Sequence, residues 1–136
     1  MSGISSTSKT GPKRRRRTAR VAARILDREH LIQMGYYTKA REGFPNDAAL
    51  AAAFPVHRSR IASWKQGEAP DAENKRLLRD LAIAVDELEK VYDSDVIPDW
   101  LFAERTGGPS PMELLRRGNL AEVLHLINAA STGAYS

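Results

Sequence analysis

The chain has 136 residues, no cysteine and a net charge of +4. This length suits one compact domain with a tail or two very small domains. The absence of cysteine excludes disulfides and thiolate metal sites and fits a reducing cytosol, so we expect a cytoplasmic protein. No apolar run approaches the roughly 20 residues that span a bilayer, so we expect no membrane partner.

Residues 1–22 are predicted to form a disordered basic arm. They are rich in Ser, Thr, Gly, Lys and Arg, and burial of so few apolar groups cannot offset the entropy of ordering them. Residues 1–20 contribute +7 to the net charge of +4, so the remaining residues carry −3. A basic arm on a mildly acidic body favours contact with DNA phosphates or the minor groove, and a solubilising tail is the alternative. Its cationic run is Lys13, Arg14, Arg15, Arg16 and Arg17.

Residues 21–43 predict a helix, because apolar side chains recur on roughly one face. Gly43 and Pro45 end it, and Gly35 marks a possible kink or break. A second, short and alanine-rich helix is predicted from Asp47 to Ala53, with Asn46 as its N-cap. The proline that follows biases the preceding phenylalanine away from helical geometry, which ends this helix.

A third helix is predicted from about His57 to Gln66, with Gly67 as its C-terminal stop. Ile61 and Trp64 fall on one helical face, so the two short helices can pack as a helix-turn-helix. Many such motifs carry a glycine in the turn where this chain has Pro55, so the turn must differ in detail. The predicted packed side consists of Leu50, Phe54, Val56, Ile61 and Trp64.

The opposite face of this third helix is short, polar and cationic. The major groove of double-stranded DNA admits one helix and presents hydrogen-bond donors and acceptors. Arginine can bind guanine, glutamine can bind adenine, and serine can reach bases or phosphates. An ordinary helical hairpin with a solvated second helix is the alternative. The predicted DNA-binding residues are Arg58, Ser59, Arg60, Ser63, Lys65 and Gln66.

A long helix is predicted from about Ala72 to Tyr92, with Asp71 as its N-cap. Its apolar residues recur at steps of three and four, which forms a continuous stripe. The stripe can complete the core of the helix-turn-helix domain, predicted over residues 23–95. It can instead form the seam of a homodimer or a higher oligomer.

Residues 96–136 predict a second, small helical domain. Asp99 is placed to cap a short helix. Ser110, followed by proline at the first helical position, caps another, which ends at Gly118. Asn119 caps the last helix. The chain is therefore expected to be all-α.

Several short motifs in this second domain resemble the toxin-binding domain of the Xre/MbcA/ParS antitoxin family. Their order and spacing match, and the helix-turn-helix with its long helix lies where the family has it. The resemblance implies an Xre-like helix-turn-helix domain followed by a small toxin-binding domain. The matching elements are Trp100-Leu101, Gly108-x-x-Pro111-x-x-Leu114-Leu115, Gly118, Val123-x-x-x-Ile127 and Gly133-Ala134-Tyr135.

The resemblance implies a type II antitoxin that represses its own operon and neutralises a RES-domain toxin, an enzyme that consumes NAD⁺. In this family the C-terminal end of the antitoxin blocks the entrance to the toxin's active site. That end corresponds to Gly133, Ala134 and Tyr135, with structural support from Trp100, Pro111, Leu114 and Leu115. The basic arm is not part of the family pattern. A stand-alone chromosomal or phage regulator, which uses the C-terminal domain for oligomerisation, is therefore the alternative.

An enzyme is not indicated. The sequence has no phosphate-cradling glycine loop and no Ser/His/Asp or Cys/His arrangement. Its three histidines, His30, His57 and His125, are far apart and have no cysteine beside them, which is not a metal-binding pattern. We therefore predict no catalytic residue, no metal and no cofactor.

Overall fold

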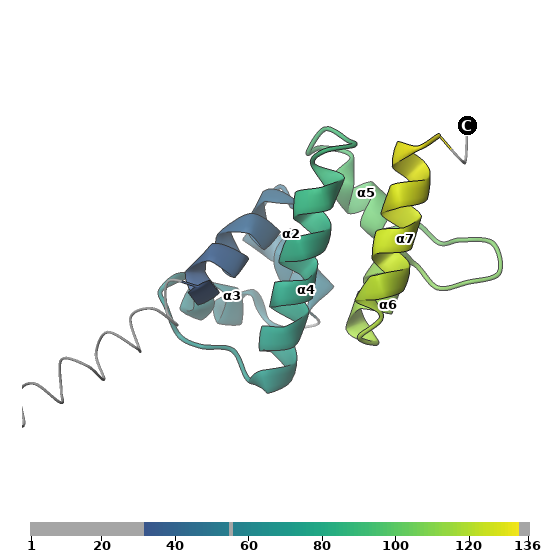
Figure 1. Ribbon diagram of the computed structural model, residues 1–136. Helices are drawn as coiled ribbons and strands as arrows, with labels where there is room; N and C mark the ends of the chain where they lie inside the picture. Colours follow the sequence, from purple (N-terminus) through teal and green to yellow (C-terminus); the bar gives the residue numbers. More distant parts are fainter. Residues whose placement is uncertain (1–31, 55, 134–136) are drawn as a thin grey trace, which may run out of the picture. The chain divides into compact units, whose positions relative to one another are not determined.

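The computed structural model describes residues 32–54 and 56–133, and every regular element among them is a helix (Figure 1). The predicted all-α class is therefore confirmed. The predicted basic arm, with Lys13 to Arg17, lies outside the described residues. Residues 32–42 are helical, and the elements that follow are α2 (Asp47–Ala53), α3 (Arg58–Lys65), α4 (Ala72–Leu88), α5 (Ile97–Phe102), α6 (Pro111–Arg116) and α7 (Leu120–Ser131).

The helix over residues 32–42 continues through Gly35, so the possible break there does not occur. It ends just before Gly43, where the chain crosses closely over α4. A Cβ atom on Gly43 would lie 2.7 Å from Cγ2 of Val85. Only glycine leaves room for this approach.

The caps of α2 and α3 explain where these two short helices begin and end. The Asn46 side chain accepts a hydrogen bond of 2.8 Å from the Ala49 amide, as an N-cap does. His57 is the N-cap of α3 rather than its first residue, because its ring Nδ1 accepts from the Ser59 amide at 3.1 Å. Gly67 has a φ of 107°, which confirms it as the stop after α3.

The two short helices pack against each other through the predicted side. The rings of Phe54 and Trp64 meet edge to face, with centroids 5.1 Å apart. Leu50 and Ile61 are fully buried, and Val56 is half-buried. Pro55 lies outside the described residues. The predicted helix-turn-helix is therefore present, with Trp64 facing inward.

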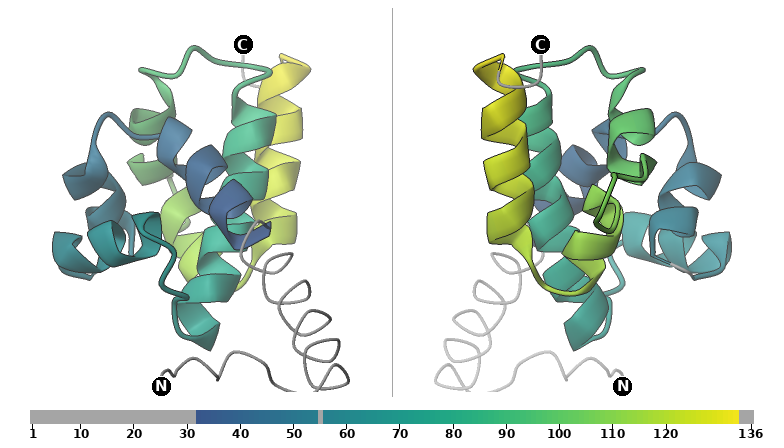
Figure 2. Two further views of the ribbon diagram at one scale, coloured as in Figure 1. Left: turned by 90° about the vertical axis from the view of Figure 1, so that its left-hand side faces the viewer. Right: turned by 90° about the vertical axis from the view of Figure 1, so that its right-hand side faces the viewer.

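Helix α4 is the central element of the described unit. It packs against α6 and α7 (Figure 2), and Leu78, Leu81 and Val85 are fully buried. Its apolar stripe completes the core of this one chain. The domain boundary at residue 95 and the oligomeric state stay predictions.

The prediction that α4 reaches Tyr92 is wrong, since the helix ends at Leu88. The backbone beyond it continues as turns, in which the Leu88 carbonyl accepts from the Val91 amide at 2.9 Å and from the Tyr92 amide at 2.8 Å. Val91 and Tyr92 still pack against the core, which is why their apolar spacing imitated a longer helix.

The prediction that Asp99 caps α5 is also wrong. The helix begins earlier, at Ile97, with Val96 as an N-cap that makes no side-chain hydrogen bond. Pro98 does not prevent this, because amides of the first helical turn have no intrahelical acceptor.

The other two predicted caps in this half are confirmed. Ser110 Oγ accepts from the Glu113 amide at 3.2 Å at the start of α6, and Asn119 Oδ1 accepts from the Glu122 amide at 3.2 Å at the start of α7. Gly118, with a φ of 82°, makes the turn between these two helices.

Candidate functional site

The outer face of α3 is the first candidate surface. Its inner face is formed by Ile61 and Trp64, which are 0% and 5% exposed. The predicted DNA-binding residues lie on the other side. Arg58, Ser59, Arg60, Lys65 and Gln66 are exposed, and Ser63 is half-buried. The structure thus brings these six residues together on α3 and its C-cap, Gln66.

A groove of about 650 Å³ lies beside the beginnings of α2 and α3. Sequence reasoning did not assign several of its lining residues to a site, among them Arg41, Asn46 and His57. The His57 ring nitrogen lies 3.0 Å from Ser59 Oγ, and this contact orders the first turn of α3. The residues that line the groove are Arg41, Asn46, Asp47, Ala48, His57, Arg58, Ser59 and Ala62.

Asp47 neutralises part of the positive charge near this groove. It accepts a hydrogen bond of 2.8 Å from Arg41 Nε and one of 3.2 Å from the Tyr37 hydroxyl, and it lies 3.9 Å from Lys65 Nζ. The Arg41 hydrogen bond is the main reason that the pKa of the Asp47 carboxyl lies below its ordinary value. Burial raises the pKa of Tyr37, and Asp47 adds to that shift.

Arg41 and Lys65 both have Asp47 as an acidic partner, whereas Arg58 and Arg60 do not. Within residues 32–54 and 56–133, neither Arg58 nor Arg60 forms an ion pair with a carboxylate. Their charges are therefore the uncompensated ones on α3, available to a polyanion.

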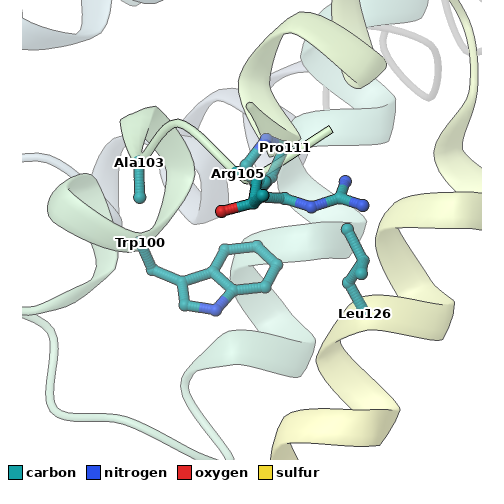
Figure 3. A pocket seen from close by; sticks show the side chains of 6 residues that line it. Trp100, Ala103, Arg105, Pro111 and Leu126 are labelled. Atoms are coloured by element: carbon teal, nitrogen blue, oxygen red, sulfur yellow. The ribbon is translucent and has the colours of Figure 1, made fainter. Parts of the chain in front are cut away.

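The second candidate surface is a cleft of about 430 Å³ in the C-terminal half (Figure 3). Figure 3 shows the Trp100 indole on one side, the Arg105 side chain above it and Leu126 of α7 across from them. Trp100 and Pro111 were expected only as supporting residues. The cleft is lined by Trp100, Ala103, Arg105, Thr106, Pro111 and Leu126.

A tight turn between α5 and α6 positions Arg105. The Gly108 amide donates to the Arg105 carbonyl at 3.2 Å, and these residues also form an isolated antiparallel bridge. Gly107 has a φ of 78°, which favours glycine at this position of the turn. The sequence signal for the turn was the Gly-Gly-Pro run, but that run does not predict that Arg105 lines the cleft.

The predicted plug is described only in part. Gly133 is exposed in the turn after α7, with a φ of 77°, whereas Ala134 and Tyr135 lie outside the described residues. Leu114 and Leu115 are buried in the core, where they hold α6 in place. In the part of the chain that the structure describes, no group of three or more His, Cys, Asp or Glu side chains could hold a metal ion. No helix in that part has both the length and the apolar character needed to cross a membrane.

Comparisons with known proteins bear on the whole arrangement. No protein-family model matches the chain, and neither does any curated protein. One solved structure does match, the crystal structure of the M. tuberculosis MbcT-MbcA toxin-antitoxin complex. The match has a TM-score of 0.61 and 25% identity, and it covers 74% of this chain and 94% of the matched chain. It confirms the resemblance based on the C-terminal motifs, and the chain accordingly has the fold of an MbcA-type antitoxin.

Proposed function

We propose that the chain is a type II antitoxin that binds DNA through α3, represses its own operon and neutralises a RES-type toxin that consumes NAD⁺. The observation that carries this proposal is the structural match to a chain of the MbcT-MbcA complex, which covers 94% of that chain. The helix-turn-helix and the small C-terminal helices both lie within the compact unit that begins at Gln33.

The exposed face of α3 supports the DNA-binding part of the proposal. A helix of its length is about 12 Å long, which suits one crossing of the major groove. Arg58 and Arg60 bring positive charge that no acid of the described residues neutralises. A homodimer or higher oligomer would present two copies of α3 to two half-sites.

The C-terminal end is proposed to enter the toxin's active-site entrance. An aromatic residue such as Tyr135 can bury a large area there at a small cost in side-chain entropy. The test is to produce the chain together with a RES-domain toxin and to measure complex formation and cellular NAD⁺. Removal of residues 132–136 should abolish NAD⁺ protection, because it removes the proposed plug. All residues of α7, which ends at Ser131, are retained in this variant.

The matched control is removal of residues 1–20, which should leave NAD⁺ protection unchanged. If the chain without residues 132–136 still protects NAD⁺, the C-terminal end is not the plug.

The basic arm favours a second candidate function, a stand-alone regulator whose C-terminal domain serves oligomerisation. The run Lys13 to Arg17 departs from the antitoxin pattern and suits phosphate contacts. In this alternative the chain binds DNA but no RES-domain toxin.

Removal of residues 1–20 should weaken binding to all DNA sequences and flatten the salt dependence of that binding. An unchanged salt slope would show that the arm does not contact phosphates.

A further inference from the structure

The cleft beside Trp100 is a second feature of the C-terminal half that the proposed plug does not use. Its volume of about 430 Å³ falls in the range of roughly 300–1,000 Å³ that is usual for ligand sites. Trp100, Pro111 and Leu126 give it a mainly apolar lining, and Figure 3 shows the flat indole turned toward the space. An aromatic or large aliphatic side chain suits such walls.

Arg105 supplies the polar part of the cleft. Its Nη1 makes one long contact of 3.4 Å with the Pro109 carbonyl. Its Nη2 would lie 3.5 Å from a Cβ atom on Gly108, so the guanidinium is held against the turn. Across the described ranges, no carboxylate pairs with this half-buried cation.

A positioned guanidinium without an acidic partner is complementary to a carboxylate, which it can bind through two parallel hydrogen bonds. The apolar side of the cleft argues against nucleic-acid phosphates as the occupant, because they would leave Trp100 and Leu126 facing a strongly hydrated group. The combination is complementary to an apolar group with an acid beside it, which a segment of a partner protein can present.

We infer that this cleft is a second docking site for the toxin, where it receives an aromatic side chain flanked by an Asp or Glu that pairs with Arg105. The inference rests on the proposed function, since it names a further contact with the same partner. The anchor fills the space between Trp100 and Leu126. The acid fixes its orientation, which adds specificity to the contact made by the C-terminal end.

The first experiment measures, by isothermal titration calorimetry, the affinity of the full chain for the RES-domain toxin used to test the proposed function. Arg105→Gln should raise Kd at least about tenfold, because a hydrogen bond to a charged group is lost. Arg105→Lys should restore part of the affinity. Arg117→Gln is the matched control, since that exposed arginine lies outside the cleft, and it should leave Kd unchanged.

The outcomes separate the two claims. A toxin that fails to bind the unaltered chain overturns the proposed function and the docking site with it. A toxin that binds the unaltered chain and the Arg105→Gln variant equally overturns only the docking site. Melting temperatures of the variants should match that of the unaltered chain, so that a change in Kd reports on binding.

The second experiment tests the chemistry of the cleft without the toxin. The chain has two tryptophans, so the two indole N–H signals in an NMR spectrum report on Trp100 in the cleft and on Trp64 in the core. N-acetyl-phenylalanine should shift the Trp100 signal at lower concentration than its uncharged amide, and Trp64 should not respond. Arg105→Gln should remove this preference for the carboxylate. Equal shifts by both probes, or no shift by either, would contradict the assignment.

Discussion

Arg116 caps the carboxyl end of another helix, because its Nε donates a hydrogen bond of 3.0 Å to the carbonyl oxygen of Ala53. Ala53 is the last residue of α2, and the same guanidinium also donates to the Ala52 carbonyl at 3.1 Å. Carbonyls at a helix C-terminus lack intrahelical donors, and a cation is favourable there. The end of α6 therefore holds the helix that leads into the turn of the helix-turn-helix.

Replacing Arg116 with alanine should lower the free energy of unfolding by about 1–3 kcal/mol, because two carbonyl oxygens lose a charged donor. Urea unfolding followed by circular dichroism measures this loss. Arg117→Ala is the control and should change stability by less than about 0.5 kcal/mol, as exposed substitutions usually do. Equal stability of the two variants would mean that water replaces Arg116 at the end of α2 without cost.

Trp64 is the second stability prediction. Its indole is 5% exposed and packs edge to face on Phe54, so Trp64→Ala should cost about 3–5 kcal/mol through lost burial and a residual cavity. Thermal unfolding compares the melting temperatures of Trp64→Ala and Trp100→Ala. The loss should be smaller for Trp100→Ala, since Trp100 lines an open cleft and is only half-buried. A Trp64→Ala protein with the melting temperature of the unaltered chain would show that the α2–α3 pair contributes little to the core.

Asp47 makes stability depend on pH. The hydrogen bond from Arg41 lowers the pKa of the Asp47 carboxyl in the folded state. A lowered pKa means that the contribution of Asp47 is fully present above its unfolded pKa, about 3.9, and is lost as pH falls through the folded value. Asp47→Asn should therefore be less stable than the unaltered chain at pH 6, and the difference should shrink below about pH 4.

Urea unfolding of both proteins at pH 6 and at pH 3 checks this prediction. Asp95→Asn is the control, because Asp95 is exposed and, in the described part of the chain, pairs with no cation. A stability difference for Asp47→Asn that is the same at both pH values would show that the Arg41 contact does not depend on the charge of Asp47.

Local signals in the sequence predicted the helix-turn-helix well. Asn46 as a cap, the proline after Phe54 and the spacing of Ile61 and Trp64 all act within one or two helical turns, so their effects can be deduced from neighbouring residues. The predictions failed where distant packing decides the geometry. Val91 and Tyr92 pack on the core from a turn, and that arrangement depends on segments far away in the chain.

The two candidate sites also differ in whether local sequence signals or distant packing form them. The outer face of α3 follows from helical periodicity alone, and its predicted residues lie together. The cleft could not be predicted in this way, because Arg105 comes from a turn and Leu126 from the middle of α7. Only the folded chain brings these residues to one space beside Trp100.

Arg58 should determine DNA specificity. It begins α3, where a cation is unfavourable for helix stability, and no described acid pairs with it. Arg58→Ala should therefore weaken binding to the operator by roughly 1–3 kcal/mol and relax sequence preference, without loss of melting temperature. Fluorescence anisotropy with the chain's own upstream DNA and a shuffled duplex measures both effects. Lys65→Ala is the control. Lys65 is suited to phosphates, so its loss should weaken binding to both duplexes equally. If Arg58→Ala loses the same affinity for both duplexes, Arg58 contacts the DNA phosphates and not the bases. If it loses no affinity, Arg58 lies outside the interface.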